Sequence, residues 1–302
     1  MPLTLTQSIP LPPHPPGGGF DHGDVHLETG RVFVAHTAAG TVEIIDGGRG
    51  VHRGSIPGCP EASGVLCAQE EQLVFAAARG GGKVLVIAAS ANDVTKEVAA
   101  GTKPNGLAWD CGRRRLLVAD VQDFRARLVD PESGSVVAET TLPGRPRWCV
   151  FDPDGDRFLV NIREPACVAV LDAGTATVRT RWDVSGAGPH GLDLDLERGR
   201  AFVACDGGKV LALDLKTGRE AAGVPIRGEP DAIWYNPDQS LLYVAIGQPG
   251  VLDVVDTRAM TVVQEITTEA GAHTTAFDRV RQRLYVFLPG SCRAIVYEES
   301  RE

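Results

Sequence analysis

The sequence predicts an all-β protein, a seven-bladed β-propeller, on three observations. Apolar, β-branched segments such as "RVFVAH" recur along the 302 residues, and each is followed by a second apolar segment such as "VEIID". Six of the seven second segments end in a carboxylate, and the matching positions are 42 residues apart: Asp46, Ala88, Asp130, Asp172, Asp214, Asp256 and Glu298. Short strands and turns repeated at this period are typical of four-stranded propeller blades.

The elements follow from this repeat in chain order. The seventh copy ends too early for a fourth strand, and "LTLTQSIPLP" resembles the outer-strand segments "SVVAETTLPG" and "MTVVQEI". Residues 1–12 are therefore expected to supply the closing strand of the last blade, because an open ring would expose sheet edges. Residues 13–21, "PHPPGGGFD", are expected to form an irregular loop. Residues 22–302 hold the seven blades, so the whole chain is expected to be one domain.

Charge, hydropathy and cysteine content limit the partners, the location and the cofactors that we expect for this chain. The net charge of −9 argues against nucleic acid as a partner. The sequence has no apolar run long enough to span a membrane and no secretory signal, so we expect a cytoplasmic protein. The seven cysteines include no CxxC pair and are expected to be reduced. No nucleotide cofactor is expected, because "CDGGK" and "RGGGK" lack the spacing of a phosphate loop. The recurring aspartates are interpreted as turn residues that bind backbone N–H groups.

One polar residue precedes the first strand of every copy, where the loop should open at one mouth of the central channel. These residues are His22, Ser63, Asn105, Arg147, His190, Asp231 and His273. Four of them come from consecutive blades once the ring is closed, namely His22, His190, His273 and Asp231. Imidazole and carboxylate ligands suit a divalent ion such as Zn, Mn, Fe or Ni, with Mg also considered. Histidines that bond only within their own blade, and a polar ligand site without metal, are alternative interpretations.

Further polar residues are expected near the same mouth. His36, Arg163 and Asp206 follow second strands, and Glu229 lies close to the first ring. His36 or Glu229 would serve as general base, and Arg147 or Arg163 would hold an anionic group of a ligand.

The blades also carry a family resemblance. The segments "GLDLDLERGRAFVACDGGKVLALDLKTGRE" and "AIWYNPDQSLLYVAIGQPGVLDVVDTRAMTVVQEI" resemble the YncE-like, YVTN-repeat family of seven-bladed propellers. That resemblance implies the fold over essentially the whole chain and assigns no catalytic residue. Members are often periplasmic, and one branch is associated with DNA binding, whereas this chain is acidic and lacks an export signal. The architecture is more distantly similar to gluconolactonase-like hydrolases and streptogramin lyases.

Three functions follow as hypotheses. The first is binding of a small ligand, with a divalent metal, at one channel mouth. The second is a metal-dependent lactone hydrolase or lyase that uses the same residues. The third is a scaffold that binds a protein partner on one face.

Overall fold

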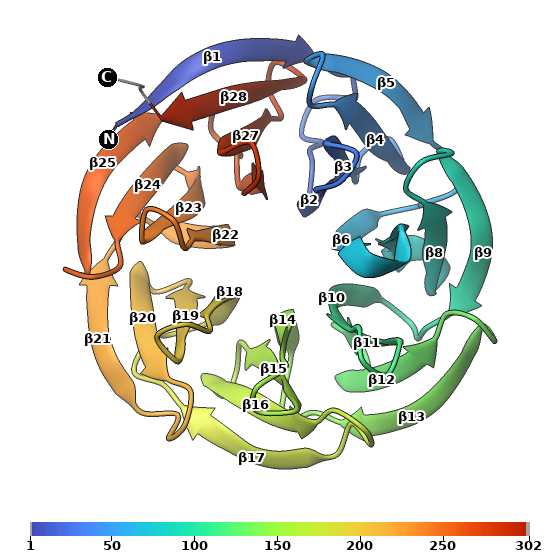
Figure 1. Cartoon of the computed structure of the whole chain (residues 1–302), viewed down its shortest axis with the longest axis vertical. Helices are drawn as coiled ribbons and strands as arrows, with labels where there is room; N and C mark the ends of the chain where they lie inside the picture. Colours follow the sequence, from blue (N-terminus) through green and yellow to red (C-terminus); the bar gives the residue numbers. More distant parts are fainter. Residues whose placement is uncertain (1, 300–302) are drawn as a thin grey trace.

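The computed structural model describes residues 2–299, which form seven four-stranded antiparallel sheets. The sheets stand side by side in a ring around a central axis (Figure 1). Each sheet is a blade, and in six of them the four strands run in chain order from the axis outward; in the seventh, β1 is the outer strand. The all-β, seven-bladed prediction is thus confirmed. Residues 300–302 of the predicted last blade, and residue 1 of the predicted closing strand, lie outside the described residues.

The strands fall into four concentric sets. The first strands, nearest the axis, are β2 (Gly23–His26), β6 (Ala62–Ala68), β10 (Pro104–Asp110), β14 (Pro146–Asp152), β18 (Pro189–Asp195), β22 (Glu229–Asn236) and β26 (Thr274–Asp278). The second strands are β3 (Arg31–His36), β7 (Leu73–Ala78), β11 (Arg115–Asp120), β15 (Arg157–Ile162), β19 (Arg200–Cys205), β23 (Leu241–Gln248) and β27 (Arg283–Leu288).

The third strands are β4 (Thr41–Asp46), β8 (Lys83–Ala88), β12 (Arg125–Asp130), β16 (Cys167–Asp172), β20 (Lys209–Asp214), β24 (Val251–Asp256) and β28 (Arg293–Glu299). The outer strands are β5 (Val51–Ile56), β9 (Asp93–Ala99), β13 (Ser135–Thr141), β17 (Val178–Asp183), β21 (Glu220–Pro225), β25 (Thr261–Thr267) and β1 (Leu3–Pro10). Two 3₁₀ turns, η1 (Gln69–Glu71) and η2 (Arg79–Gly81), complete the elements of residues 2–299. No helix in this range is long and apolar enough to cross a membrane.

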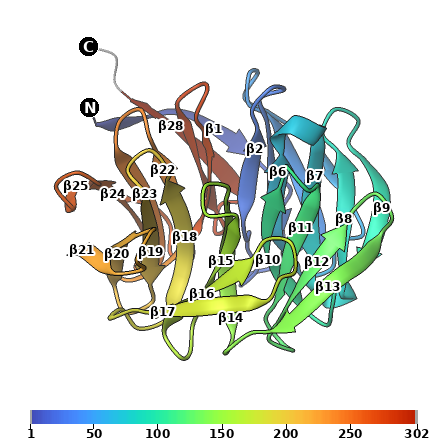
Figure 2. The same cartoon turned by 60° about the horizontal axis from the view of Figure 1, so that its bottom comes forward.

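Closure of the ring follows the prediction made from the N-terminal segment. Strand β1 pairs antiparallel with β28, from Leu3 opposite Glu299 to Pro10 opposite Arg293. Figures 1 and 2 both show β1 in blue beside β28 in red. The backbone of Leu3 also exchanges two hydrogen bonds with the side chain of Gln264 in the neighbouring blade. The closing strand therefore joins two blades.

The core lies between neighbouring blades. Second and third strands are buried on both faces, which explains their unbroken apolar runs in the sequence. One cluster, for example, packs Phe33 and Ile44 of the first blade against Val74 and Leu85 of the second. Outer strands such as β25 alternate between exposed and half-buried residues, because only one face meets a neighbour.

The recurring aspartates act as turn residues, as interpreted from the sequence. Asp130 Oδ1 accepts backbone hydrogen bonds from Glu132 and Ser133, and Asp256 Oδ1 accepts them from Arg258 and Ala259. Their carboxylates are engaged in the turns and are not directed at the channel.

Glycines allow the first strands to approach one another around the channel. A Cβ atom on Gly106 or Gly191 would collide with the backbone oxygen of Arg147 or Asp231 in the next blade. Any larger residue here must push the neighbouring first strand away, and with it Arg147 or Asp231 near the start of that strand.

We expect Gly191→Ala to destabilise the protein by about 1–3 kcal/mol, because the added methyl group overpacks the contact with the Asp231 backbone. The matched control is Gly174→Ala, where the nearest atom to the added Cβ is Asp172 Oδ1 at 3.5 Å. Urea denaturation of both variants measures the difference. Equal midpoints for the two variants would contradict the close approach.

Candidate functional site

The upper mouth of the channel is the end at which the first strands begin. Here three histidines face one carboxylate, that of Asp231. The Nε2 atoms of His190 and His22 lie 3.0 and 3.8 Å from Asp231 Oδ1, and His273 Nε2 lies 3.7 Å from Asp231 Oδ2. The structure therefore brings together all four residues that the sequence nominated as metal ligands. They reach one another because each lies at the start of the first strand of a consecutive blade: His22 and His273 directly precede β2 and β26, and His190 and Asp231 lie in the first residues of β18 and β22.

His190 lies between two carboxylates. Its Nδ1 atom is 2.8 Å from Asp206 Oδ1, and its Nε2 atom faces Asp231. Burial alone would lower the pKa of His190, but the charge of Asp231 and the hydrogen bond with Asp206 raise it to about 9. Burial likewise opposes ionisation of Asp231, yet the nearby imidazoles hold the pKa of its carboxyl well below the usual range. At neutral pH the pair is thus an imidazolium and a carboxylate.

His22 lies deeper than its two partners. Its side chain is buried, and its ring stacks on Trp148 with 4.0 Å between ring centroids. Trp148 belongs to the fourth blade and His22 to the first, so the contact crosses the channel. Burial lowers the pKa of His22, which favours the neutral imidazole. The contact of His22 with Trp148 was not predicted, because residues that meet across the ring are far apart in the sequence and share no recognisable motif.

A cavity of about 320 Å³ opens above these residues. Its charged and polar lining comes from four consecutive blades and includes Arg147, Arg163, His190, Asp206, Glu229, Asp231 and His273. Arg163 is paired with Asp206, at 2.8 Å between Nε and Oδ2. The buried Nε atom of Arg147 has no hydrogen-bond partner among residues 2–299. Burial also lowers the pKa of the Arg147 guanidinium. The cavity is thus lined by a guanidinium group whose Nε atom has no hydrogen bond within this range of residues.

The two residues nominated as general base are separated. Glu229 lines the cavity, whereas the structure does not bring His36 to it. His36 is fully buried, with Nδ1 3.0 Å from Glu43 Oε1 and Nε2 2.7 Å from His14 Nδ1. Its position in the strand register matches that of Cys205, one residue before Asp206. A shift of one residue turns a strand side chain to the other face, here into the blade interior.

The remaining residues of the predicted ring lie away from the cluster. Ser63 Oγ is 3.2 Å from the carbonyl oxygen of Pro104 in the next blade. Asn105 Oδ1 accepts a 3.2 Å hydrogen bond from Arg79. These contacts tie the second and third blades together, and the charged Arg79 on this side of the mouth is paired with Asp21 and Glu61.

The arrangement of the four candidate ligands is not that of a formed metal site. Among the described residues, no group of three or more His, Cys, Asp or Glu side chains is set to hold an ion. Asp231 lies between the histidines and contacts His190 directly, so the donors face the carboxylate and not a shared point. A metal would have to displace this ion pair.

Fold and cavity together define the class: a seven-bladed β-propeller with histidine, aspartate and arginine side chains at one mouth. Among solved structures, the chain is similar to hydrazine synthase of Kuenenia stuttgartiensis, with a TM-score of 0.84 and 12% sequence identity. The similarity covers 96% of this chain and 98% of that chain, and at this identity it shows the fold alone. No protein-family model and no curated protein matches the sequence. Membership of the YncE-like family therefore stays a prediction.

Proposed function

We propose that this propeller binds a divalent transition-metal ion at its upper mouth, and that the ion and Arg147 together hold a small anionic ligand. The observation that carries the proposal is the convergence of three imidazole Nε2 atoms, from three blades, on the single carboxylate of Asp231.

The spacing of the donor atoms supports a metal. Four ligands at tetrahedral Zn–N and Zn–O distances lie about 3.4 Å from one another. The three measured separations from Asp231 are 3.0, 3.7 and 3.8 Å, so small side-chain rotations would place an ion among the donors. His190 also has the outer partner typical of a metal-bound histidine, because Asp206 accepts a hydrogen bond at its other nitrogen. Metal binding would release the His190 proton, since a ligating imidazole is neutral.

The cavity above the ion supports an anionic ligand. Arg147 contributes a half-buried guanidinium whose Nε lacks a partner, and a carboxylate or phosphate group would satisfy it. Arg163 stands at the same wall but already pairs with Asp206, so it is expected to contribute less. The volume of about 320 Å³ suits a small molecule and not a polymer.

The test is elemental analysis of tag-free protein, combined with thermal melting with and without a chelator. We expect about one equivalent of metal in the wild type and a lower melting temperature after chelation. Asp231→Asn should retain less than about a tenth of that metal, because a charged ligand is lost. His52→Gln is the matched control, since His52 binds Glu43 within the first blade. Absence of metal and of any chelator effect, or equal loss in both variants, would refute the proposal.

A further inference from the structure

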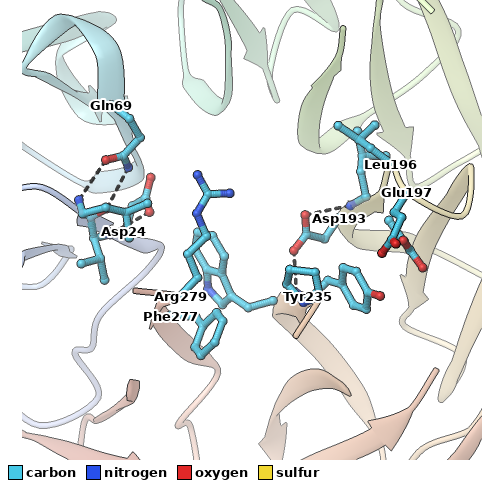
Figure 3. A pocket seen from close by; sticks show the side chains of 14 residues that line it. Asp24, Gln69, Asp193, Leu196, Glu197, Tyr235, Phe277 and Arg279 are labelled. Carbon is cyan, nitrogen blue, oxygen red and sulfur yellow. Dashed lines mark hydrogen bonds between the residues drawn. The ribbon is translucent and has the colours of Figure 1, made fainter. Parts of the chain in front are cut away.

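A second cavity, of about 380 Å³, lies at the lower mouth of the channel, where the first strands turn into the second. Figure 3 shows its lining, in which the side chain of Arg279 stands between Asp24 on one side and Asp193 on the other. The cavity does not share a lining residue with the cavity of the upper mouth. It therefore needs its own explanation.

The two carboxylates occupy positions that are apolar in the other blades. Asp24 lies opposite Phe33 and Asp193 opposite Phe202, which places them at one level of the channel wall. By the same register, the remaining five blades carry Leu66, Ala108, Val150, Trp234 and Ala276 at this level. At this level of the wall, carboxylates therefore occur in the first and fifth blades, and both of them line the cavity.

Each carboxylate also ties two blades together. Asp24 accepts backbone hydrogen bonds of 2.7 Å from Val25 and from Cys67 in the next blade. Asp193 accepts them from Leu194 at 2.8 Å and from Tyr235 in the next blade at 2.7 Å. Because each oxygen takes one bond and has two lone pairs, both groups can still accept hydrogen bonds from a ligand.

Arg279 supplies the opposite charge. It lies on the turn after β26, and its guanidinium makes no hydrogen bond or ion pair with any residue in the range 2–299. Its charge acts on both Asp24 and Asp193. The lining residues at the same turn position in other blades, Leu27, Gln69, Leu196 and Pro237, are uncharged, and Glu197 on the turn after β18 adds a further carboxylate. Arg279 is thus a free cation at the edge of a cavity with acidic walls.

Between these charges the lining is apolar and aromatic. Trp234, Phe277 and Pro237 contribute to it, and Trp234 is held in place by a 3.1 Å hydrogen bond from Nε1 to the carbonyl oxygen of Thr275. A fixed apolar surface beside a few convergent polar groups is the usual composition of a small-molecule site.

We propose that the lower mouth binds a small zwitterionic amine, an α-amino acid with an apolar side chain. Its ammonium group bonds Asp193, its carboxylate bonds Arg279, and its side chain packs on Trp234 and Phe277. This site is separate from the metal and anion site proposed for the upper mouth.

The titration of Asp193 agrees with this assignment. Burial raises the pKa of Asp193 to about 6. An ammonium group beside this carboxylate favours its charged form, so binding near pH 6 should release protons. Calorimetry in buffers of different ionisation enthalpy measures that release.

The experiment is calorimetric titration of the full chain with L-phenylalanine, phenethylamine and N-acetyl-L-phenylalanine. Chelator is present throughout, so that metal at the upper mouth does not contribute. We expect L-phenylalanine to bind, phenethylamine to bind at least tenfold more weakly because it lacks the carboxylate, and the acetylated compound not to bind. A screen of the other apolar amino acids follows in the same format. Failure of every amino acid to bind the wild type would overturn the proposal.

Variants of the protein test the carboxylate and the ammonium group of the ligand separately. Arg279→Gln should weaken binding of L-phenylalanine at least tenfold and leave that of phenethylamine within twofold, whereas Asp193→Asn should weaken both. Arg281→Gln is the matched control on the same turn, because Arg281 is already paired with Asp278. Thermal melting of each variant establishes that it is folded. An Arg279→Gln affinity equal to that of the wild type, or loss in Arg281→Gln as well, would contradict the site.

Discussion

Ile9→Glu is expected to open the ring. Ile9 is fully buried on the closing strand β1, where it packs with Phe20 of the following loop, Val25 of the first blade and Phe287 of the last. A carboxylate placed there has no partner, so its burial should cost at least about 4 kcal/mol, the range of the most damaging substitutions. Urea denaturation measures the loss, and the variant should also elute as larger species, because an unpaired β28 edge invites association.

The same strand provides the control. Leu5 lies on β1 as well, but 58% of its surface is exposed. Leu5→Glu should change the free energy of unfolding by no more than about 0.5 kcal/mol. If the two variants were equally stable, the closing role of β1 would be refuted.

The ion pair of His190 and Asp231 is expected to make stability depend on pH. The folded pKa of His190, about 9, lies above its ordinary value of 6.5. The stabilisation is therefore complete below about pH 6.5 and is lost as the pH rises through about 9. From the size of the shift, the loss should be about 3 kcal/mol. In Asp231→Asn the partner charge is absent, so the variant should be less stable at pH 6 and should approach the wild type near pH 9.5.

Urea denaturation at the two pH values, with reductant and chelator present, measures this convergence. Asp183→Asn is the control, since Asp183 is exposed and should follow the wild type at both pH values. A constant difference between Asp231→Asn and the wild type across the range would show that His190 does not titrate as a partner of Asp231.

The fold could be predicted because the repeat is recorded in the sequence itself. The spacing of 42 residues locates the third strand of each blade, and the unbroken apolar runs mark the strands that are buried on both faces. The closing strand could be found from its likeness to other outer strands. These features are local patterns, so they can be recognised in the sequence without knowledge of three-dimensional contacts.

The site could be predicted only in part. The repeat places His22, His190, His273 and Asp231 at one mouth, but it does not give the orientation of their side chains. His22 turns inward to Trp148, whereas the side chain of His273 stays 35% exposed. Irregular pairing near the start of the first strand, as between Pro189 and Leu192, recurs in five blades. The interpretation of His36 failed on register, because "RVFVAH" aligns with "RAFVAC" and places His36 at the position of Cys205, one residue before Asp206.

Pairing of β1 with β28 has a consequence for the order in which the chain acquires its structure. Six blades are meanders of consecutive strands, which can assemble from nearby residues as soon as they are available. The seventh requires Leu3 to meet Glu299, the longest loop closure among the described residues, and its entropic cost is met last. On a ribosome, this strand must therefore wait without a partner until β28 has been synthesised. The polar residues that alternate along it keep it from pairing elsewhere in the meantime.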